Sequence, residues 1–233
     1  MIPLKDYPGP RRSFPWVMLT ILLVNVLVFV FELGFGSVAD LDSLFASAGV
    51  VPIEYTRGVL VAQPPLGIVW LTLITSMFLH GGFLHIASNM LYLFIFGDNV
   101  EDIFGHLRFL LFYFVCGIAA GLTHIAVNAG SQVPSIGASG AIAGVLAAYL
   151  RVFPSASVRT LLFIGPFITV PRISAFLLIG FWFVMQFLTG LTSLGAQTEQ
   201  TSGVAVWAHI GGFLAGLILV QLMPPRRRPV FSA

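Results

Sequence analysis

Two short glycine-rich stretches lie within apolar segments of this chain: GASG at 137–140 and AHIGG at 208–212. The first begins a small-xxx-small step that continues at Gly144, and the second begins another that continues at Gly216. Such steps allow membrane helices to pack backbone to backbone. Because His209, Gly212 and Gly216 follow i, i+3, i+7 spacing, the histidine is expected to face a neighbouring helix rather than lipid. The two stretches therefore predict closely packed helices that bring Ser139 and His209 together.

The composition is that of a polytopic membrane protein. The chain has 233 residues, of which 58% are hydrophobic and 9% charged, and its mean hydropathy is +0.98. A soluble globular domain carries roughly 25% charged residues. The net charge of +2 is small and the basic residues are dispersed, which argues against nucleic-acid binding. Cys116 is the only cysteine, so no internal disulfide can form, and we interpret it as a packed, unreactive thiol.

Several apolar segments approach the length of about 20 residues that a helix needs to cross a bilayer. Two further apolar runs, 66–79 and 158–170, are shorter and fit re-entrant or interfacial pieces better than spans. The second is also interrupted by Pro166 and closed by Pro171. The sequence therefore predicts an all-α membrane protein, a six-transmembrane-helix bundle whose spans lie near 15–34, 83–101, 107–128, 139–154, 173–190 and 205–223.

The basic residues indicate how these spans are oriented. With six spans and a cytoplasmic N-terminus, ten of the eleven Lys and Arg residues lie on the cytoplasmic side and only Arg57 lies outside, as the positive-inside rule requires. Treating 158–170 as a span would place Arg159 and Arg172 on opposite sides. We therefore predict that both termini are cytoplasmic. The chain would consist of a tail over 1–14, a transmembrane domain over 15–223 and a basic tail over 224–233.

The start of the chain allows another interpretation. The stretch RRSF at 11–14, before an apolar run, resembles a twin-arginine signal, and SVA at 37–39 could serve as its cleavage site. The apolar stretch is long for a signal peptide, and its removal would leave five spans and a misplaced C-terminal Arg cluster, so we favour a retained first span. No transit peptide is expected, and a compact chain of this kind suggests a prokaryotic cell membrane.

Four polar residues share one depth in this topology. Spans two, four and six all begin at the outer face. Near their first residues lie four polar side chains: Ser139, His209, His85 and Asn89. A serine is activated when a base lies within roughly 2.6 to 3.2 Å, which points to Ser139 as nucleophile and His209 as base. His85 and Asn89 are i and i+4 on one helix and, with the Ser139 backbone N–H, could donate to an oxyanion. A polar clamp between helices is the other reading of this pair.

Other chemistries fit the sequence less well. No acid is placed to complete a triad, so a Ser-His dyad is the simpler interpretation. The chain lacks a His-Glu-x-x-His motif, and no carboxylate or thiol accompanies its outer histidines, so we expect no metal and no cofactor. The sequence also shows neither the matched broken helices nor the chain of intramembrane charges that would indicate a transporter.

The chain resembles the rhomboid family of intramembrane serine proteases. The resemblance covers roughly residues 14–223 and rests on motifs in the family's order: HIASNM at 85–90, FGDNVE at 96–101, GASG at 137–140, and AHIGG at 208–212 with Gly216. It implies that Ser139 is the nucleophile, that His209 is the general base, and that His85, Asn89 and the Ser139 backbone are oxyanion donors. The implied substrates are single-span membrane proteins, cleaved near the outer face of the lipid bilayer.

The same resemblance assigns roles to other segments. Segment 35–82 corresponds to a large, partly membrane-embedded first loop, and Glu101 to a structural acid at the cytoplasmic end of span two. The fifth span, with FWF at 181–183, corresponds to the helix beside which substrates enter, and 191–204 to a cap over the site. The family's frequent Trp-Arg pair is missing from the first loop. An inactive rhomboid-like protein that binds and escorts membrane proteins, or a small transporter, is the alternative; the presence of both Ser139 and His209 favours the enzyme.

Overall fold

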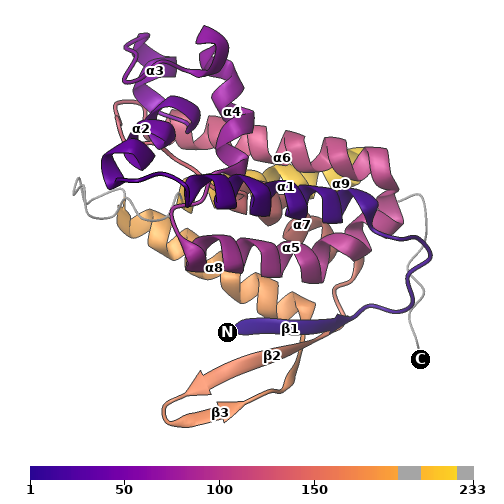
Figure 1. Cartoon of the computed structure of the whole chain (residues 1–233). Coiled ribbons are helices and arrows are strands. Elements are labelled where there is room, and N and C mark those ends of the chain that lie inside the picture. The colour runs from indigo at the N-terminus through magenta and orange to yellow at the C-terminus, as the bar shows by residue number, and fades with distance from the viewer. Residues whose placement is uncertain (194–205, 225–233) are drawn as a thin grey trace.

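A computed structural model of the chain describes residues 1–193 and 206–224. Residues 194–204 of the expected cap and 225–233 of the expected C-terminal tail lie outside the described residues. Each predicted span coincides with a helix whose ends differ from the prediction by a few residues (Figure 1). These helices are α1 (Trp16–Glu32), α5 (Phe83–Phe104), α6 (His106–Val127), α7 (Ser139–Val152), α8 (Ala175–Ser193) and α9 (Val206–Leu222).

Length and apolarity alone single out fewer spans than six. Among the described residues, α6 is the one helix both long and apolar enough to cross a bilayer by itself. The turns over Val69–Phe78 and helix α5 pass the same test only as a pair bent by 83°. The apolar stretches of α1, α7, α8 and α9 have at most 17 residues, which corresponds to about 26 Å of helix. The helical bundle is therefore clear, while the count of six spans stays a prediction.

Helix α7 is the most deeply buried helix of the bundle. Every residue from Gly140 to Tyr149 is buried, and α7 packs against both α6 and α9. The approach of α9 depends on glycine: a methyl group at Gly212 would overlap the carbonyl oxygen of Gly140, and one at Gly216 would lie 2.5 Å from that of Gly144. The predicted backbone-to-backbone packing is confirmed. Cys116 of α6 is buried against the same helix, which agrees with its interpretation as a packed thiol.

The segment between α1 and α5 folds into short helices. It contains α2 (Val38–Ala48), α3 (Pro52–Arg57) and α4 (Thr72–Thr75), with the 3-10 turns η1 (Pro65–Gly67), η2 (Val69–Leu71) and η3 (Ser76–Phe78). The apolar run 66–79 is thus divided into short turns, in line with the prediction that it does not form a regular span. Thr75 Oγ1 donates to the Ala48 carbonyl at 2.6 Å, and α4 packs on α6. The loop is therefore attached to one end of the bundle (Figure 1).

A four-stranded antiparallel sheet corrects the prediction of an all-α protein. Its central strand β2 (Ser157–Ile164) pairs with β1 (Ile2–Tyr7), β3 (Phe167–Thr169) and β4 (Arg172–Ser174). The run 158–170, predicted as a re-entrant or interfacial piece, supplies β2 and β3. Its residues alternate with a period of two, because Val158 and Thr160 are fully buried while Arg159 is exposed. Gly165, at a φ of +59° that favours glycine, forms the turn with Pro166.

The start of α1 is capped by an acid from another helix. Its own N-cap is Pro15, which makes no side-chain hydrogen bond. Glu101 of α5 is fully buried and accepts the N–H groups of Val17 at 3.0 Å and Met18 at 2.7 Å. A carboxylate in this position satisfies free N–H groups and complements the helix dipole. Glu101 therefore ties α5 to α1, in keeping with the structural role that the resemblance implies.

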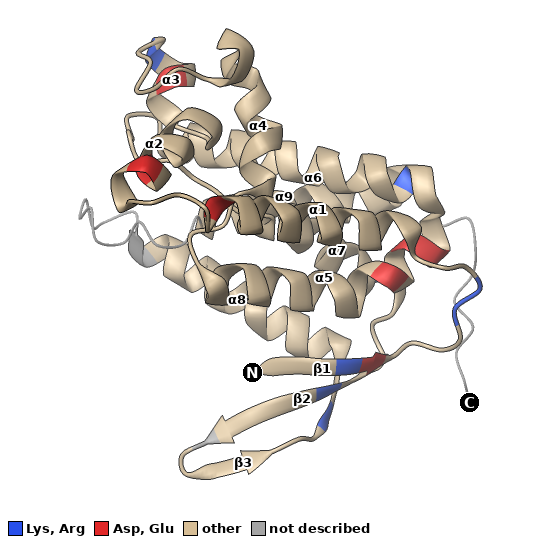
Figure 2. Ribbon diagram, viewed as in Figure 1, with Lys and Arg blue, Asp and Glu red and all other residues tan. Residues whose placement is uncertain are grey.

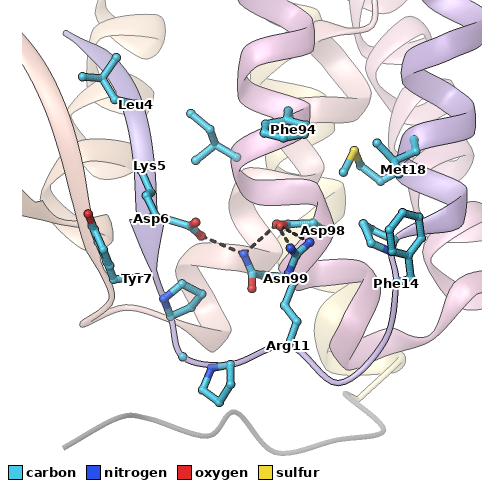
Figure 3. Close-up of a pocket in the computed structure, with 16 residues that line it drawn as sticks. Leu4, Lys5, Asp6, Tyr7, Arg11, Phe14, Met18, Phe94, Asp98 and Asn99 are labelled. Carbon is cyan, nitrogen blue, oxygen red and sulfur yellow. Dashed lines mark hydrogen bonds and ion pairs between the residues drawn. The ribbon is translucent and has the colours of Figure 1, made fainter.

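The N-terminal segment crosses the same end of α5 (Figure 3). Asn99 Nδ2 donates to Asp6 at 2.9 Å, Tyr149 Oη donates to the same carboxylate at 2.7 Å, and Arg11 pairs with Asp98 at 2.8 Å. Asp6, Arg11, Asp98 and Asn99 line a cavity of about 750 Å³. Burial raises the pKa of Asp6 from 3.8 to about 6. The predicted tail 1–14 is thus packed against the helices.

Candidate active site

Ser139 and His209 lie in hydrogen-bond contact. Ser139 is the first residue of α7 and His209 lies in the first turn of α9. The His209 Nε2 atom is 2.6 Å from Ser139 Oγ, and the histidine is only 8% exposed. The distance is within the range over which a base can accept the proton of a hydroxyl nucleophile. Two residues 70 positions apart are brought together because glycines allow α7 and α9 to touch.

The loop before Ser139 is built around a glycine. Gly137 has a φ of +122°, which L-residues rarely adopt. Its N–H donates to the carbonyl of Ser76 at 2.8 Å, which fixes the loop to the turn before α5. A methyl group at Gly137 would lie 2.7 Å from His85 Nε2 and 3.7 Å from Ser139 Oγ. His85 is therefore a direct neighbour of the serine loop.

The hydrogen bonds of His85 assign its ring proton. The Gly81 N–H donates to His85 Nδ1 at 3.2 Å, so Nδ1 is an acceptor. In a neutral imidazole the other nitrogen then carries the hydrogen. His85 Nε2, which faces Gly137, is consequently a donor beside Ser139.

Asn89 presents a buried donor without a partner. It lies one turn after His85 on α5 and is 6% exposed. Its Nδ2 is fully shielded and has no hydrogen-bond partner among the described residues. An unpaired buried donor is costly unless another group completes it. The clamp between helices considered for this residue would need a partner, and the described part of the chain supplies none to Nδ2.

Helix α8 supplies two contacts to His209 that the sequence interpretation missed. Gln186 Oε1 lies 3.0 Å from His209 Nδ1, and the Trp182 ring lies 5.8 Å from the histidine ring, tilted by 42°. Trp182 and Gln186 are i and i+4, so they share one face of α8. An isolated amide in a strongly apolar segment was the available signal, because such side chains hydrogen-bond across membrane helices.

The remaining polar residues near this end of the bundle make contacts with residues other than Ser139 and His209. The His80 ring is 5.0 Å from that of His85, and its backbone N–H donates to Glu32 at 3.1 Å. Glu32 at the end of α1 is thus buried against the His80 backbone. His124 instead contacts Asn128 at the end of α6. Within 1–193 and 206–224, no three His, Cys, Asp or Glu side chains gather as metal ligands would.

Comparison with known proteins places this site in a family context. The rhomboid domain model matches residues 68–226. The chain is 33% identical over 159 residues to the chloroplastic Rhomboid-like protein 11 of Arabidopsis thaliana, which covers 66% of this chain and 52% of that protein. It is 43% identical over 83 residues to Rhomboid protease GluP of Bacillus subtilis, covering 36% of this chain and 16% of that protein. Over 81 residues it is 38% identical to Putative rhomboid protease YdcA of the same bacterium. This match covers 35% of this chain and 40% of that protein.

These relatives come from several compartments, and the chain spans about half of their length or less. They include chloroplastic and mitochondrial plant proteins as well as bacterial ones. The comparisons therefore do not single out the prokaryotic cell membrane that the sequence suggested.

Proposed function

The chain belongs to the rhomboid family of membrane-embedded proteins, and we propose that it is a serine-type endopeptidase that cleaves membrane-spanning segments of other proteins. The observation that carries this proposal is the 2.6 Å contact between Ser139 Oγ and His209 Nε2. Family membership supports it because the relatives include two bacterial proteins named as rhomboid proteases. The two polar side chains meet among buried apolar residues. Placing polar side chains there costs free energy, so their presence favours a functional role.

In the proposed reaction Ser139 is the nucleophile and His209 the general base. His209 Nε2 takes the hydroxyl proton as Ser139 Oγ attacks the carbonyl carbon of the scissile peptide. The C–N bond then breaks, and His209 returns the proton to the departing amine. Water, deprotonated by the same nitrogen, attacks the acyl ester and releases the second product. His209 gives the proton it took from water to the departing Ser139 Oγ, which restores both residues.

Three donors are proposed to stabilise the negative charge on the carbonyl oxygen. His85 Nε2 faces the serine loop, Asn89 Nδ2 lacks a partner among the described residues, and the Ser139 N–H lies at the start of α7. Donors held in position in a site that excludes water stabilise charge that develops only in the transition state. We assign His85, Asn89 and the Ser139 backbone to the oxyanion hole.

Gln186 takes the place that an acid holds in a triad. If its Oε1 accepts the hydrogen of His209 Nδ1, the lone pair of Nε2 faces Ser139, which is the form a general base needs. The Trp182 ring restricts rotation of the imidazole from the side. Gln186 is therefore a positioning residue, and it extends the predicted dyad.

The site also limits what can be cleaved. A peptide carbonyl in a regular helix is hydrogen-bonded and cannot reach Ser139, so the substrate helix must open locally. We expect single-span proteins with small or helix-breaking residues near the scissile bond. Cleavage would occur near the outer face, in a six-span topology with tails over 1–14 and 224–233 in the cytoplasm and the bundle over 15–223 in a cell membrane.

The test is peptide cleavage by the purified full chain in detergent. A generic single-span substrate is mixed with wild type and with Ser139→Ala, and a fluorophosphonate probe reports the reactivity of the serine. Cleavage and labelling by wild type, both absent from Ser139→Ala, are expected. Folded wild-type protein that binds the substrate without cutting it would favour the escort alternative. Cleavage by the alanine variant would exclude Ser139 as nucleophile.

A further inference from the structure

Three basic side chains form a row across one face of the sheet. Lys5 of β1 pairs with Arg159 of β2, and Arg159 pairs with Arg172 of β4. Directly paired residues project from the same face of a sheet. All three residues are exposed, and Figure 2 shows basic positions on neighbouring strands near the end of the sheet opposite the β2–β3 turn. Like charges placed opposite each other destabilise a sheet, so an anion bound between them would stabilise it.

No ion pair joins these three residues to a carboxylate within the described residues, and Asp6, beside Lys5, pairs with Val158 and so projects from the opposite face of the sheet. The ion pairs found in the described part of the chain join Arg11 to Asp98 and His106 to Glu101. Tyr7 instead contacts two of the cations: the Arg172 guanidinium lies 4.6 Å and Lys5 Nζ 5.5 Å from its ring centre. Through these cation–π contacts Lys5 and Arg172 share one aromatic partner. Within the described residues, the three cations thus share one face of the sheet with Tyr7 and make no ion pair there.

The same face becomes apolar toward the hairpin turn. Phe163 lies four residues after Arg159 on β2 and pairs with Ile168 of β3. Phe163 is 60% exposed and Ile168 67% exposed, while Phe167, which pairs with Ile164 and so projects from the opposite face, is 73% exposed. Four residues of strand correspond to about 13 Å. A strip of positive charge is therefore followed, at roughly that distance, by large uncovered hydrophobic side chains.

The sheet is continuous with a helix that exposes apolar side chains. Strand β4 ends at Ser174 and α8 begins at the next residue. Phe176 and Leu177, in the first turn of α8, are 60% and 62% exposed. In a membrane-embedded chain, apolar side chains exposed at the start of a span lie near the boundary between headgroups and acyl chains. The predicted topology puts that boundary in the cytoplasmic leaflet, which carries anionic lipids.

We propose that this face of the sheet binds anionic phospholipid of the cytoplasmic leaflet. The two guanidinium groups donate to phosphate oxygens, and Lys5 adds a third positive charge. The hairpin turn, with Phe163, Phe167 and Ile168, lies among acyl chains and gains from their burial. The proposal depends on membrane embedding and is independent of peptidase activity.

The experiment measures lipid binding to the purified full chain by native mass spectrometry. Phosphatidylglycerol and phosphatidylcholine are compared as probes, and wild type should retain the anionic lipid preferentially. Each basic residue near an anionic surface contributes about a factor of five, so the double variant Arg159→Gln/Arg172→Gln should bind phosphatidylglycerol about 25-fold more weakly. Arg159→Lys/Arg172→Lys, which keeps the charge, should retain most of the binding. Arg12→Gln/Arg151→Gln removes two other exposed charges and is the matched control.

The apolar part of the proposal has its own variant. Phe163→Ser/Ile168→Ser should weaken binding of phosphatidylglycerol but leave binding of glycerol phosphate unchanged. If the glutamine variant does not fold, this serine variant together with the lysine variant decides the question. Equal binding of the two lipids, equal losses in both glutamine doubles, or glycerol phosphate binding as tight as phosphatidylglycerol would overturn the proposal, the last by indicating a site for free phosphate.

Discussion

Replacing Gln186 by leucine tests how His209 is held. Leucine has a similar size but no acceptor, so the hydrogen on His209 Nδ1 would lose its 3.0 Å contact. An unpaired buried polar group costs about 1 to 3 kcal/mol. If that cost falls on the transition state, in which the imidazole becomes charged, kcat should drop about 5- to 150-fold. KM should change little, because the contact does not touch the substrate.

The assay is cleavage of a fluorogenic single-span substrate across a range of pH, together with the rate of fluorophosphonate labelling at Ser139. Gln221→Leu is the matched control, since Gln221 lies on α9 and its amide donates to the Leu217 carbonyl of its own helix. Gln186→Glu keeps an acceptor and adds a negative charge that favours protonated His209. The rise of its cleavage rate with pH should therefore occur at higher pH than in wild type. A purely structural role of Gln186 would lower the melting temperature without moving this rise. Wild-type kcat and labelling in Gln186→Leu would refute the positioning role and leave the Ser139–His209 proposal intact.

Three further predictions concern other parts of the molecule. Asn89→Ala should lower kcat by about 10² to 10³ with little change in KM; a lower melting temperature with normal kcat would make Asn89 structural. On a background without Cys116, an impermeant thiol reagent should label a cysteine near residue 50 or 132 and spare one in either tail, and the reverse pattern would reject the topology. Asp6 has a folded-state pKa of about 6 against 3.8. It binds its proton more tightly when folded, so its contribution to stability is present below about pH 3.8 and is lost as pH rises through 6. The melting temperature of Asp6→Asn should lack this decline.

The contact between α7 and α9 could be predicted because its signals are local, whereas the packing of α6 against both was not predicted. Gly140 and Gly144 mark one helix face, and Gly212 and Gly216 mark another, so the spacing alone identified the surfaces that meet. Because spans four and six both enter from the outer face in the predicted topology, Ser139 and His209 were expected at the same depth. No knowledge of the loops was needed for the juxtaposition of these two residues.

The pairing of β1 with β2 could not be predicted because it is not local. Strand β1 joins residues 2–7 to 157–161, and its sequence IPLKDY contains a proline and two charges that give no strong strand signal. A short apolar run such as 158–170 also fits a strand or a buried helical piece equally well. Strand β2 pairs with β3 and β4 close by in sequence and with β1 about 150 residues away, and the last of these partners gives no signal within the run itself.

The contact made by Gln186 shows where the sequence interpretation of the site stopped and why. The search for a third member considered carboxylates alone, and none was near. At this depth a carboxylate would have to lose its hydration beside lipid, which costs several kcal/mol even when the charge is paired. An amide oxygen accepts the same Nδ1 hydrogen without that charge. Its partner could be identified only from the rotation of α8, since Gln186 and His209 lie 23 residues apart on different helices. In an apolar site, the group that orients a catalytic histidine should therefore be sought among neutral acceptors as well as among acids.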